Sequence, residues 1–308
     1  MIPQFPSFIR LGIHHKDQIN KHVYQFEPYS DFNFVSMWSW NTSGAVKVSS
    51  LHDNLVLQFS DYVTNEYFYT FLGTHNPEDT IERLLKLATQ KGFKAELRLI
   101  PESNLNGKSS CFEKRYILKE DISNHDYIYD VLDLITLKGG KYRNLRKIIN
   151  KYSNKYAHTT MRRLDISDRQ EQKKVVDLLD RWKRKNKNND NNTERELHAL
   201  KRIFTLARHT ELIGLGFFDN NTLIGLQINE IINNTYYMAH YGKSDNSYKE
   251  LFKYLVVEGA RYMTSLGCSR ANFQQDLGIP GLRKSKMAFK PSGYLKKYVI
   301  RAKQKTIV

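Results

Sequence analysis

The chain has 308 residues, and 48 basic against 32 acidic side chains give it a formal net charge of +16. This length is typical of two domains, and a content of 40% hydrophobic and 12% aromatic residues excludes disorder as the overall state. No apolar run approaches the roughly 18–20 residues of a membrane-spanning helix, and residues 1–10 lack the pattern of a signal peptide. The two cysteines, Cys111 and Cys268, form neither a disulfide framework nor a metal-site spacing. These features predict a soluble, globular protein of a reducing, cytoplasmic compartment.

The first distinct element along the chain is a hairpin predicted at residues 54–73, and residues 223–242 form a second copy. Each segment contains two β-rich runs around a polar turn, which is typical of a β-hairpin. At a constant offset of 169 the copies align without a gap. The identical pairs are Leu57 and Leu226, Gln58 and Gln227, Asn65 and Asn234, Tyr67 and Tyr236, and Gly73 and Gly242.

An amphipathic helix and a further strand are predicted after each hairpin. Asn76 and Pro77 indicate the start of the first helix, and Gly92 its end. Leu251 and Leu255 lie on one face of the second helix, which we expect to end at Gly267. Short strands at residues 93–100 and 268–274 follow. The order strand, strand, helix, strand therefore occurs twice, which indicates a duplicated α/β domain with mixed sheets.

The repeat predicts the division of the chain. We expect a first domain at residues 1–128, a basic connecting helix at 129–156 and a second domain at 157–308. Residues 183–193 are polar and rich in asparagine, and they predict an exposed loop.

Positive charge is concentrated in two stretches. Residues 138–187 contain 17 basic and 5 acidic side chains, and residues 277–308 contain 9 basic side chains and no acidic one. The remaining 226 residues sum to a charge of −5. One interpretation is a pair of solvated basic helices, and the other is a shared positive surface for a polyanion such as nucleic acid, anionic lipid or a nucleotide.

Two segments carry a resemblance to a known family. One is Leu137-Lys-Gly-Gly-Lys-Tyr-Arg-Asn-Leu-Arg-Lys-Ile-Ile-Asn-Lys-Tyr152, in which a glycine pair opens a basic helix. The other is Asn272-Phe-Gln-Gln-Asp-Leu-Gly-Ile-Pro-Gly-Leu-Arg-Lys-Ser-Lys286, followed by Phe289-Lys-Pro291. Together they resemble the phosphatidylglycerol lysyltransferase C-terminal-domain-like proteins.

The resemblance implies a tandem pair of acetyltransferase-like (GNAT) domains, in agreement with the repeat. It also implies an acyltransferase that moves an aminoacyl group from aminoacyl-tRNA to an amine or hydroxyl acceptor such as a phospholipid headgroup. Lys243 and Glu258 lie where the family has a lysine after the second hairpin and a glutamate on the following helix. The chain departs from the lipid-modifying members in lacking a membrane-spanning half.

A coenzyme A site needs a glycine-rich loop whose backbone N–H groups bind the pyrophosphate. The corresponding segments, residues 73–78 and 242–247, each contain one glycine together with an acidic residue. This composition argues against acetyl-CoA or another acyl-CoA without excluding it, and we expect no bound cofactor.

Aminoacyl transfer makes other demands on the chain. The donor is an activated ester, so the protein must position the acceptor, stabilise the developing oxyanion and neutralise phosphates of the tRNA. Lys141, Arg143, Arg146 and Lys147 are candidates for the phosphate contacts, the alternative being a basic helix with its apolar face packed inward.

The second quoted segment and its surroundings provide the candidate reaction site. We expect Asp276 and Glu258 to be catalytic, either as a contact for the substrate amine or as a general base. The alternatives are an aspartate that caps its own turn and a glutamate that pairs with Arg261 or Lys253. The candidate substrate-binding residues are Lys243, Arg283, Lys286, Asn272 and His240, and a lone histidine on a strand is more often a packed residue.

The sequence thus favours an aminoacyltransferase whose partner is aminoacyl-tRNA or another polyanionic donor. We expect a cleft bordered by the second hairpin, the start of its helix and the turn from Asp276 to Lys286, with both basic clusters on one connected surface. Ten scattered histidines show no ligand spacing, so we expect no metal site. The alternatives are a CoA-dependent N-acyltransferase and a non-catalytic protein that binds RNA or an anionic membrane surface, with the location cytoplasmic or peripheral at the membrane. The sequence names neither the acceptor nor the oligomeric state.

Overall fold

The computed structural model describes residues 1–61, 64–106, 108–185, 190–233 and 235–303, and its chain forms two compact units. Unit 1 comprises Met1–Asp126, Gln275–Gly278 and Leu295–Val308, and unit 2 comprises Tyr127–Gln274 and Ile279–Tyr294. Each unit is built on one seven-stranded sheet with helices on its faces. Both sheets contain parallel and antiparallel pairs, so the predicted α/β class with mixed sheets is confirmed.

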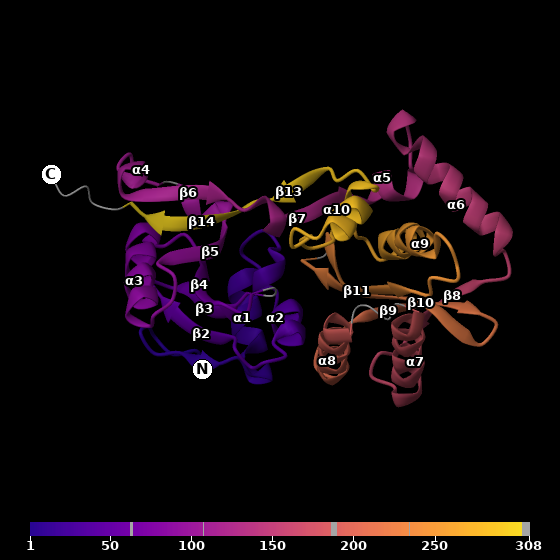
Figure 1. The fold of residues 1–308 in the computed structure, drawn as a ribbon, viewed down its shortest axis with the longest axis horizontal. Helices are drawn as coiled ribbons and strands as arrows, with labels where there is room; N and C mark the ends of the chain where they lie inside the picture. Colours follow the sequence, from indigo (N-terminus) through magenta and orange to yellow (C-terminus); the bar gives the residue numbers. More distant parts are fainter. Residues whose placement is uncertain (62–63, 107, 186–189, 234, 304–308) are drawn as a thin grey trace. The chain divides into compact units, whose positions relative to one another are not determined.

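The sheet of unit 1 has the strand order β1-β2-β3-β4-β5-β14-β6. Its strands are β1 (Ile9–Arg10), β2 (Lys47–Leu51), β3 (Asn54–Ser60), β4 (Tyr67–Leu72), β5 (Glu96–Pro101), β6 (Tyr116–Glu120) and β14 (Lys297–Ala302). Its helices are α1 (Lys16–Val23), α2 (Phe34–Trp40), α3 (Pro77–Gln90) and α4 (Phe112–Arg115). Helices α1 and α2 cover one face of the sheet, and α3 covers the other (Figure 1).

The sheet of unit 2 has the order β13-β7-β12-β11-β10-β9-β8. Its strands are β7 (Asp126–Asp130), β8 (Thr160–Leu164), β9 (Ile213–Asp219), β10 (Thr222–Ile232), β11 (Tyr236–Ser244), β12 (Arg270–Asn272) and β13 (Gly293–Leu295). Its helices are α5 (Val131–Thr136), α6 (Arg143–Lys155), α7 (Arg169–Lys185), α8 (Asp190–Leu206), α9 (Leu251–Ser265) and α10 (Pro280–Met287). Helices α7 and α8 lie on one face of the sheet and α9 on the other (Figure 1).

The duplicated element order is confirmed. β3 and β4 form an antiparallel hairpin followed by α3 and by β5, which pairs parallel to β4. β10 and β11 form the second hairpin, followed by α9 and by β12, which pairs parallel to β11. The apolar face predicted for the first helix is buried, and Gly92 and Gly267, which follow the two helices, have left-handed φ values of 71° and 92°.

The constant offset between the copies holds along the first strand of each hairpin but not across to the second. Gln58 pairs with Tyr69, whereas Gln227 pairs with Gly242. At an offset of 169 the counterpart of Tyr69 is Met238, which pairs with Glu230 instead. The second hairpin is longer and contains a β-bulge, so the alignments of Tyr67 with Tyr236 and of Gly73 with Gly242 do not correspond in register. Asn234 lies outside the described residues.

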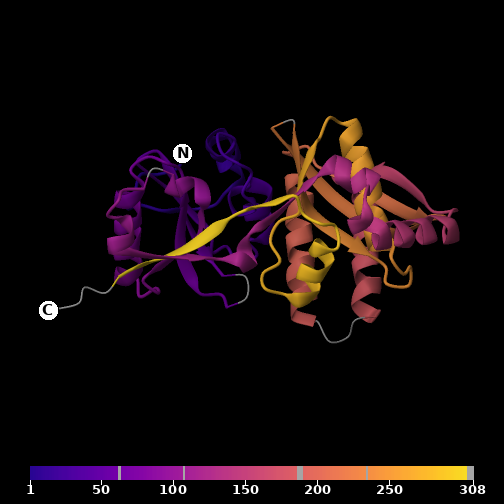
Figure 2. The ribbon, with the colours of Figure 1, turned by 90° about the horizontal axis from the view of Figure 1, so that it is seen from above.

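The compact units divide the chain differently from the predicted boundaries at three places, one of which is the segment Gln275–Gly278, expected in the second domain but part of unit 1. Residues 129–156, expected to be a connection, belong to unit 2, where Tyr129, Leu145 and Ile149 are buried in the core. β14, expected in the second domain, pairs with β5 and β6 of unit 1, as Figure 2 shows in yellow and purple. Strand pairing depends on partners far apart in the sequence, which hydrophobic periodicity does not reveal.

The segment 183–193, predicted as a loop, is helical in its described part. α7 extends to Lys185 and α8 begins at Asp190, so most of the segment is helical, and residues 186–189 lie outside the described part of the chain. Within the described residues, no helix is both long and apolar enough to cross a membrane.

Candidate active site

The strands β11 and β12 of unit 2 run together for three residue pairs and then separate. They pair from Tyr236 with Arg270 to Met238 with Asn272, after which β12 ends and β11 continues to Ser244. Ile228 pairs with Tyr241 and Asn229 with Ala239, so His240 is the extra residue of a β-bulge. We call this region the unit 2 fork. A bulge redirects side chains and interrupts strand pairing, and both features are common beside active sites.

A buried His–Glu pair lies at the bulge. His240 Nε2 lies 3.0 Å from Glu230 Oε2, and the two side chains are only 1% and 6% exposed. Gln274 Nε2 donates to the Ala239 carbonyl at 2.9 Å and lies 3.4 Å from His240 Nδ1. In this arrangement Nδ1 can accept from the Gln274 amide, and Nε2–H can donate to Glu230. Glu230 and Gln274 thus contact the two ring nitrogens of His240 and orient its imidazole.

Two amide side chains of β10 point toward α9 with unsatisfied polar atoms. Gln227 and Asn229 are two residues apart and share a face of the sheet. Gln227 Oε1 and both amide atoms of Asn229 are buried and have no hydrogen-bond partner among the described residues. Gly259 of α9 lies over Gln227 so closely that a Cβ atom would approach Oε1 to 1.9 Å. Buried polar groups are nearly always paired, so these atoms mark a position for water or a polar ligand.

Lys243 lies on the opposite face of the sheet, toward α7 and α8. Its Nζ contacts Glu196 Oε1 and Oε2 at 2.8 and 2.7 Å and lies 3.6 Å from the centre of the Trp182 ring. Burial lowers the pKa of Lys243, and the Glu196 carboxylate acts in the opposite direction. The ammonium group is thus paired within the protein, and its predicted contact with substrate stays a prediction.

The other candidates of the second segment have different surroundings. Asn272 is fully buried at the end of β12, and its Oδ1 accepts the Gln274 N–H at 2.7 Å, which joins it to the fork. Lys286 donates to the Phe273 carbonyl, and Arg283 is exposed on α10. Glu258 lies on α9, where burial raises its pKa and Arg261, 3.6 Å away, partly counteracts this effect.

Asp276 belongs to unit 1, and its carboxylate is engaged within its own turn. The side chain is completely buried, and Oδ1 accepts the Gly278 N–H at 2.8 Å. It therefore caps its own turn, the alternative left open by the sequence, and it is not a surface residue. The cleft expected between Asp276 and residues of unit 2 stays a prediction.

The four basic residues before and within α6 divide into two groups. Arg146 donates to the carbonyls of Leu137 and Gly139 at the end of α5, and Lys141 pairs with Asp133 at 3.1 Å. Arg143 and Lys147 are exposed one helical turn apart on α6. The first group stabilises the local chain, and the second remains available to solvent. That both basic clusters form one surface stays a prediction.

Unit 1 contains a buried polar cluster that sequence reasoning missed. Lys297 Nζ contacts Asp31 and lies 2.9 Å from Asp126 Oδ1, and all three side chains are at most 1% exposed. Ser30 donates to Asp126 from its backbone N–H at 2.7 Å, and Gln275 donates to Asp31 at 2.8 Å. Burial alone would lower the pKa of Lys297, but the two carboxylates hold it above its ordinary value. We call this set the unit 1 ion cluster.

The strands β4 and β5 of unit 1 separate in the same way, but this fork is closed. β4 and β5 share one pair, Tyr69 with Leu97. Asn104 Nδ2 donates to the Phe71 carbonyl at 2.6 Å, and its Oδ1 accepts the Gly73 N–H at 3.2 Å. One asparagine therefore satisfies both backbone groups at the open end of β4.

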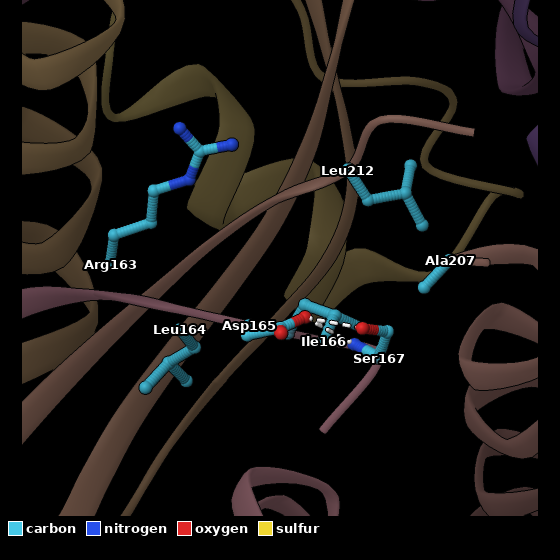
Figure 3. Close-up of a pocket in the computed structure, with 7 residues that line it drawn as sticks. All are labelled: Arg163, Leu164, Asp165, Ile166, Ser167, Ala207 and Leu212. Atoms are coloured by element: carbon cyan, nitrogen blue, oxygen red, sulfur yellow. Dashed lines mark hydrogen bonds between the residues drawn. The ribbon is translucent and has the colours of Figure 1, made fainter. Parts of the chain in front are cut away.

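An open hollow of about 270 Å³ lies beside β8 and the start of β9 (Figure 3). It is lined by Arg163, Leu164, Asp165, Ile166, Ser167, Ala207 and Leu212. Asp165 Oδ1 accepts bonds from the N–H and hydroxyl of Ser167, which hold the pKa of Asp165 below its ordinary value. Arg163 pairs with Glu211 at 3.0 Å. The charged side chains that line the hollow thus have partners within the chain. None of the fork residues lines it.

Within the described residues, no group of three or more His, Cys, Asp or Glu side chains is arranged to hold a metal ion. Of the candidates, the structure brings together His240 and Asn272 through Gln274. Glu230 and Gln274 were missed. A charged residue inside the apolar strand at 222–232 was the available signal for Glu230.

Comparisons with known proteins concern the family and the fold of the chain. A family model described as phosphatidylglycerol lysyltransferase, C-terminal, matches residues 25–301. A conserved protein of unknown function from Bacteroides thetaiotaomicron VPI-5482 is 23% identical, with a TM-score of 0.83 over 98% of this chain and 100% of that chain. L-PGS from Bacillus licheniformis is 13% identical, with a TM-score of 0.61 over 100% of this chain and 95% of that one. No curated protein sequence matches the chain. The expected pair of α/β domains with mixed sheets is confirmed, and their GNAT-like character stays a prediction.

Proposed function

The chain belongs to the phosphatidylglycerol lysyltransferase C-terminal family, and from this premise we propose that it is an acyltransferase whose reaction centre is the unit 2 fork. In our proposal it transfers an aminoacyl group from aminoacyl-tRNA to an amine or hydroxyl acceptor. The observation that carries this proposal is the buried His240–Glu230 pair at a bulge where two strands separate.

The His–Glu pair suits the proton transfer of this reaction. The acceptor nitrogen or oxygen attacks the ester carbonyl, the bond to the ribose oxygen breaks, and the acceptor loses one proton while the ribose oxygen gains one. His240 Nδ1 can take the acceptor proton once Gln274 moves aside, and Glu230 then stabilises the imidazolium through Nε2–H. The same nitrogen returns the proton to the ribose oxygen. No metal or nucleophilic side chain is required.

The unsatisfied amides of Gln227 and Asn229 supply polar groups on the α9 face of the sheet, opposite to the face of Glu230. Asn229 Nδ2 has the chemistry to donate to the carbonyl oxygen as it becomes an oxyanion, and such donors contribute strongly to acyl transfer. Glu258 and Lys243 remain proposed substrate contacts on the two faces of the sheet. We keep Asp276 only as a proposed positioning residue, because its carboxylate is engaged in its own turn.

The choice of donor rests on the backbone groups at the two forks. A coenzyme A pantetheine would need free backbone groups along the separated strand. Asn104 occupies those at Phe71 and Gly73 in unit 1, and Gln274 occupies the Ala239 carbonyl in unit 2. Gly242 lies within β11 and so is not part of a phosphate-binding loop. These contacts favour the aminoacyl ester, and the exposed Arg143 and Lys147 are the proposed phosphate contacts.

Transfer from radiolabelled aminoacyl-tRNA tests the proposal. We expect the chain to move label to hydroxylamine, a water-soluble acceptor, or to amine and phospholipid acceptors, and we expect no thiol release from acetyl-CoA. A melting temperature raised by aminoacyl-tRNA and not by acetyl-CoA would agree with this result. Acetyl-CoA turnover without transfer from tRNA would replace the proposal by the CoA-dependent alternative. Binding of RNA without any turnover would leave a non-catalytic binding protein.

A further inference from the structure

Two amide side chains lie in apolar surroundings between β10 and α9. Gln227 is 4% exposed, and Asn229 is completely buried. The residues of β9 that pair with them, Leu215 and Ile213, belong to the apolar core of unit 2. Gln227 Oε1, Asn229 Oδ1 and Asn229 Nδ2 have no hydrogen-bond partner in the described part of the chain. Leaving buried polar atoms unpaired is costly, which indicates that a further group satisfies them.

Small residues surround the two amides on their other sides. On β11, Gly242 pairs with Gln227 and Ala239 pairs with Asn229. Residues directly opposite each other in an antiparallel pair share a face of the sheet, so only a hydrogen atom and a methyl group flank the amides here. On α9, a Cβ atom at Gly259 would lie 1.9 Å from Gln227 Oε1. The small residues at these three positions keep bulky side chains away from the polar atoms.

The exposed residues of this region indicate an opening at the Gln227 end. Gly242 is exposed although it lies within β11, and in the described part of the chain β12 pairs with β11 only as far as Met238. The Phe252 ring of α9 lies 3.3 Å from the position that a Cβ atom of Gly242 would take, so the opening is narrow. A compact ligand can therefore approach the amides from the open edge of β11. We name Gln227, Asn229, Gly242 and Gly259 the α9-face amide site.

We propose that the α9-face amide site binds a compact group that carries two N–H donors beside one carbonyl oxygen. The atoms without a partner determine this chemistry, because Gln227 Oε1 and Asn229 Oδ1 accept hydrogen bonds and Asn229 Nδ2 donates. A primary carboxamide and an α-amino acyl group both have this complement. An aliphatic group would leave all three atoms unpaired, and a carboxylate offers only acceptors.

The same chemistry has two sources. A primary carboxamide ends a side chain or a free amide, and it would make the site independent of the transfer reaction. An α-amino acyl group is the reacting end of an aminoacyl ester, and this source rests on the proposed function, in which Asn229 Nδ2 donates to the ester carbonyl. Gln227 Oε1 would then accept from the α-amino group and distinguish an aminoacyl donor from a simple acyl donor, which lacks that group.

Titration of the full chain with small probes, followed by NMR, measures binding at this site. The probes are acetamide, glycine ethyl ester and acetone, and the side-chain amide signals of Gln227 and Asn229 report on the site. Acetone has the shape of acetamide but lacks its N–H groups, so it leaves the two amide oxygens unpaired. We expect acetamide or glycine ethyl ester to bind about tenfold tighter than acetone, or more. The tighter of these two probes identifies the source.

Two variants, each with a matched control, test the residues of the site. Gln227→Met removes Oε1 at similar side-chain size, and Gly259→Ala places a methyl group where Oε1 lies. Each should weaken binding of the tighter probe about fivefold or more, and Gln227→Met should not lower the melting temperature, because it removes an unpaired buried atom. The controls are Gln170→Met, an exposed residue of α7, and Gly281→Ala on α10, where an added Cβ would meet no atom within 4 Å. Both controls should bind as the unmodified chain does.

Three results would overturn the proposal. One is equal affinity for acetamide, glycine ethyl ester and acetone. Another is unchanged binding in both Gln227→Met and Gly259→Ala. The third is that no probe shifts the amide signals, which would leave the site to water alone. Binding is measured without tRNA, so probes that bind to a chain without transfer activity contradict the proposed function only, whereas transfer by a chain that binds no probe contradicts this inference only.

Discussion

The two units contain the same fold of hairpin, helix and strand, but their buried polar groups differ in one respect. In unit 1 the polar groups of the ion cluster and of Asn104 are paired with one another or with the backbone. In unit 2 the fork contains a His–Glu pair and, on the other face of β10, amide atoms that have no partner in the described part of the chain. Paired buried groups fix a structure, whereas unpaired ones need a ligand or water. In our proposal, the ion cluster and Asn104 of unit 1 therefore serve stability, and the fork of unit 2 serves the reaction.

The largest expected effect concerns the contribution of the unit 1 ion cluster to stability. Lys297→Met leaves Asp31 and Asp126 buried without their cation, and breaking a buried pair in this way costs about 3–5 kcal/mol. Urea unfolding should show this loss. Lys296→Met removes a neighbouring lysine whose side chain is 43% exposed and should change the free energy of unfolding by less than about 0.5 kcal/mol. Equal effects of the two changes would show that the cluster does not hold unit 1 together.

The next effect concerns the His–Glu pair of unit 2. His240→Gln retains a hydrogen-bonding side chain but cannot act as a base near neutral pH, and general base catalysis contributes about 100-fold or more. The rate of transfer from aminoacyl-tRNA should fall by that factor, with the remaining rate less dependent on pH. His209→Ala, an exposed histidine of the same unit, is the control. A variant as active as the unmodified chain would remove His240 from the mechanism.

These assignments depend on contacts that the sequence reveals only in part. Apolar periodicity and turn residues predicted both hairpins, the helix after each and the strand that follows. They did not predict the bulge at His240, because one extra residue in a strand leaves the hydrophobic pattern almost unchanged. Glu230 and His240 are ten residues apart, and only the pairing of β10 with β11 brings them together.

The unit 1 ion cluster was unpredictable for the same reason. Asp31, Asp126 and Lys297 are separated by 95 and 171 residues, and each looks like an ordinary surface charge in the sequence. The basic residues of the sequence were easier to interpret, because positive side chains of a helix usually reach the solvent. Arg143 and Lys147 are exposed, and their predicted phosphate contact stays a prediction, whereas the sequence did not show that Arg146 binds backbone carbonyls.

A smaller effect tests the buried Lys243–Glu196 pair and depends on pH. Glu196→Gln leaves the ammonium without its carboxylate, which should cost about 1–3 kcal/mol of unfolding free energy at pH 7. Burial already lowers the pKa of Lys243, and loss of Glu196 lowers it further. The unfolded chain then binds more protons than the folded one, so stability should recover as pH rises toward the unfolded pKa of about 10.4.

Urea unfolding at pH 7 and pH 9.5 measures whether the stability of Glu196→Gln recovers as the pH rises. The deficit of Glu196→Gln should be smaller at the higher pH. Glu194→Gln, on the same helix with a side chain that is 71% exposed, should show little deficit at either pH. A deficit of Glu196→Gln that grows with pH would mean that Lys243 is not the group that the carboxylate stabilises.

The smallest effect on stability is expected at α6. Arg143→Glu with Lys147→Glu should leave the free energy of unfolding within about 0.5 kcal/mol, because both side chains are exposed. Binding of tRNA should nevertheless weaken, and the slope of log affinity against log salt should fall by about 2, one for each phosphate that the protein no longer neutralises. Lys141→Glu tests a lysine already paired with Asp133 and should change the slope less. An unchanged slope in the double variant would place the phosphate contacts elsewhere.

The central claim, that unsatisfied polar groups in unit 2 serve the reaction while satisfied ones in unit 1 serve the fold, is tested most directly by one matched pair. Asn104→Leu and Asn229→Leu replace two fully buried asparagines, one at each fork, by a side chain of similar size. Urea unfolding and the transfer assay are measured for both variants.

We expect Asn104→Leu to lose about 1–3 kcal/mol, because the Phe71 carbonyl and the Gly73 N–H lose their partner, while the specific activity of the folded protein persists. Asn229→Leu should be as stable as the unmodified chain or more stable, since it removes an unpaired buried amide, and its transfer activity should fall at least tenfold. Equal losses of stability in the two variants, with full activity in Asn229→Leu, would contradict the assignment of the reaction to the unit 2 fork.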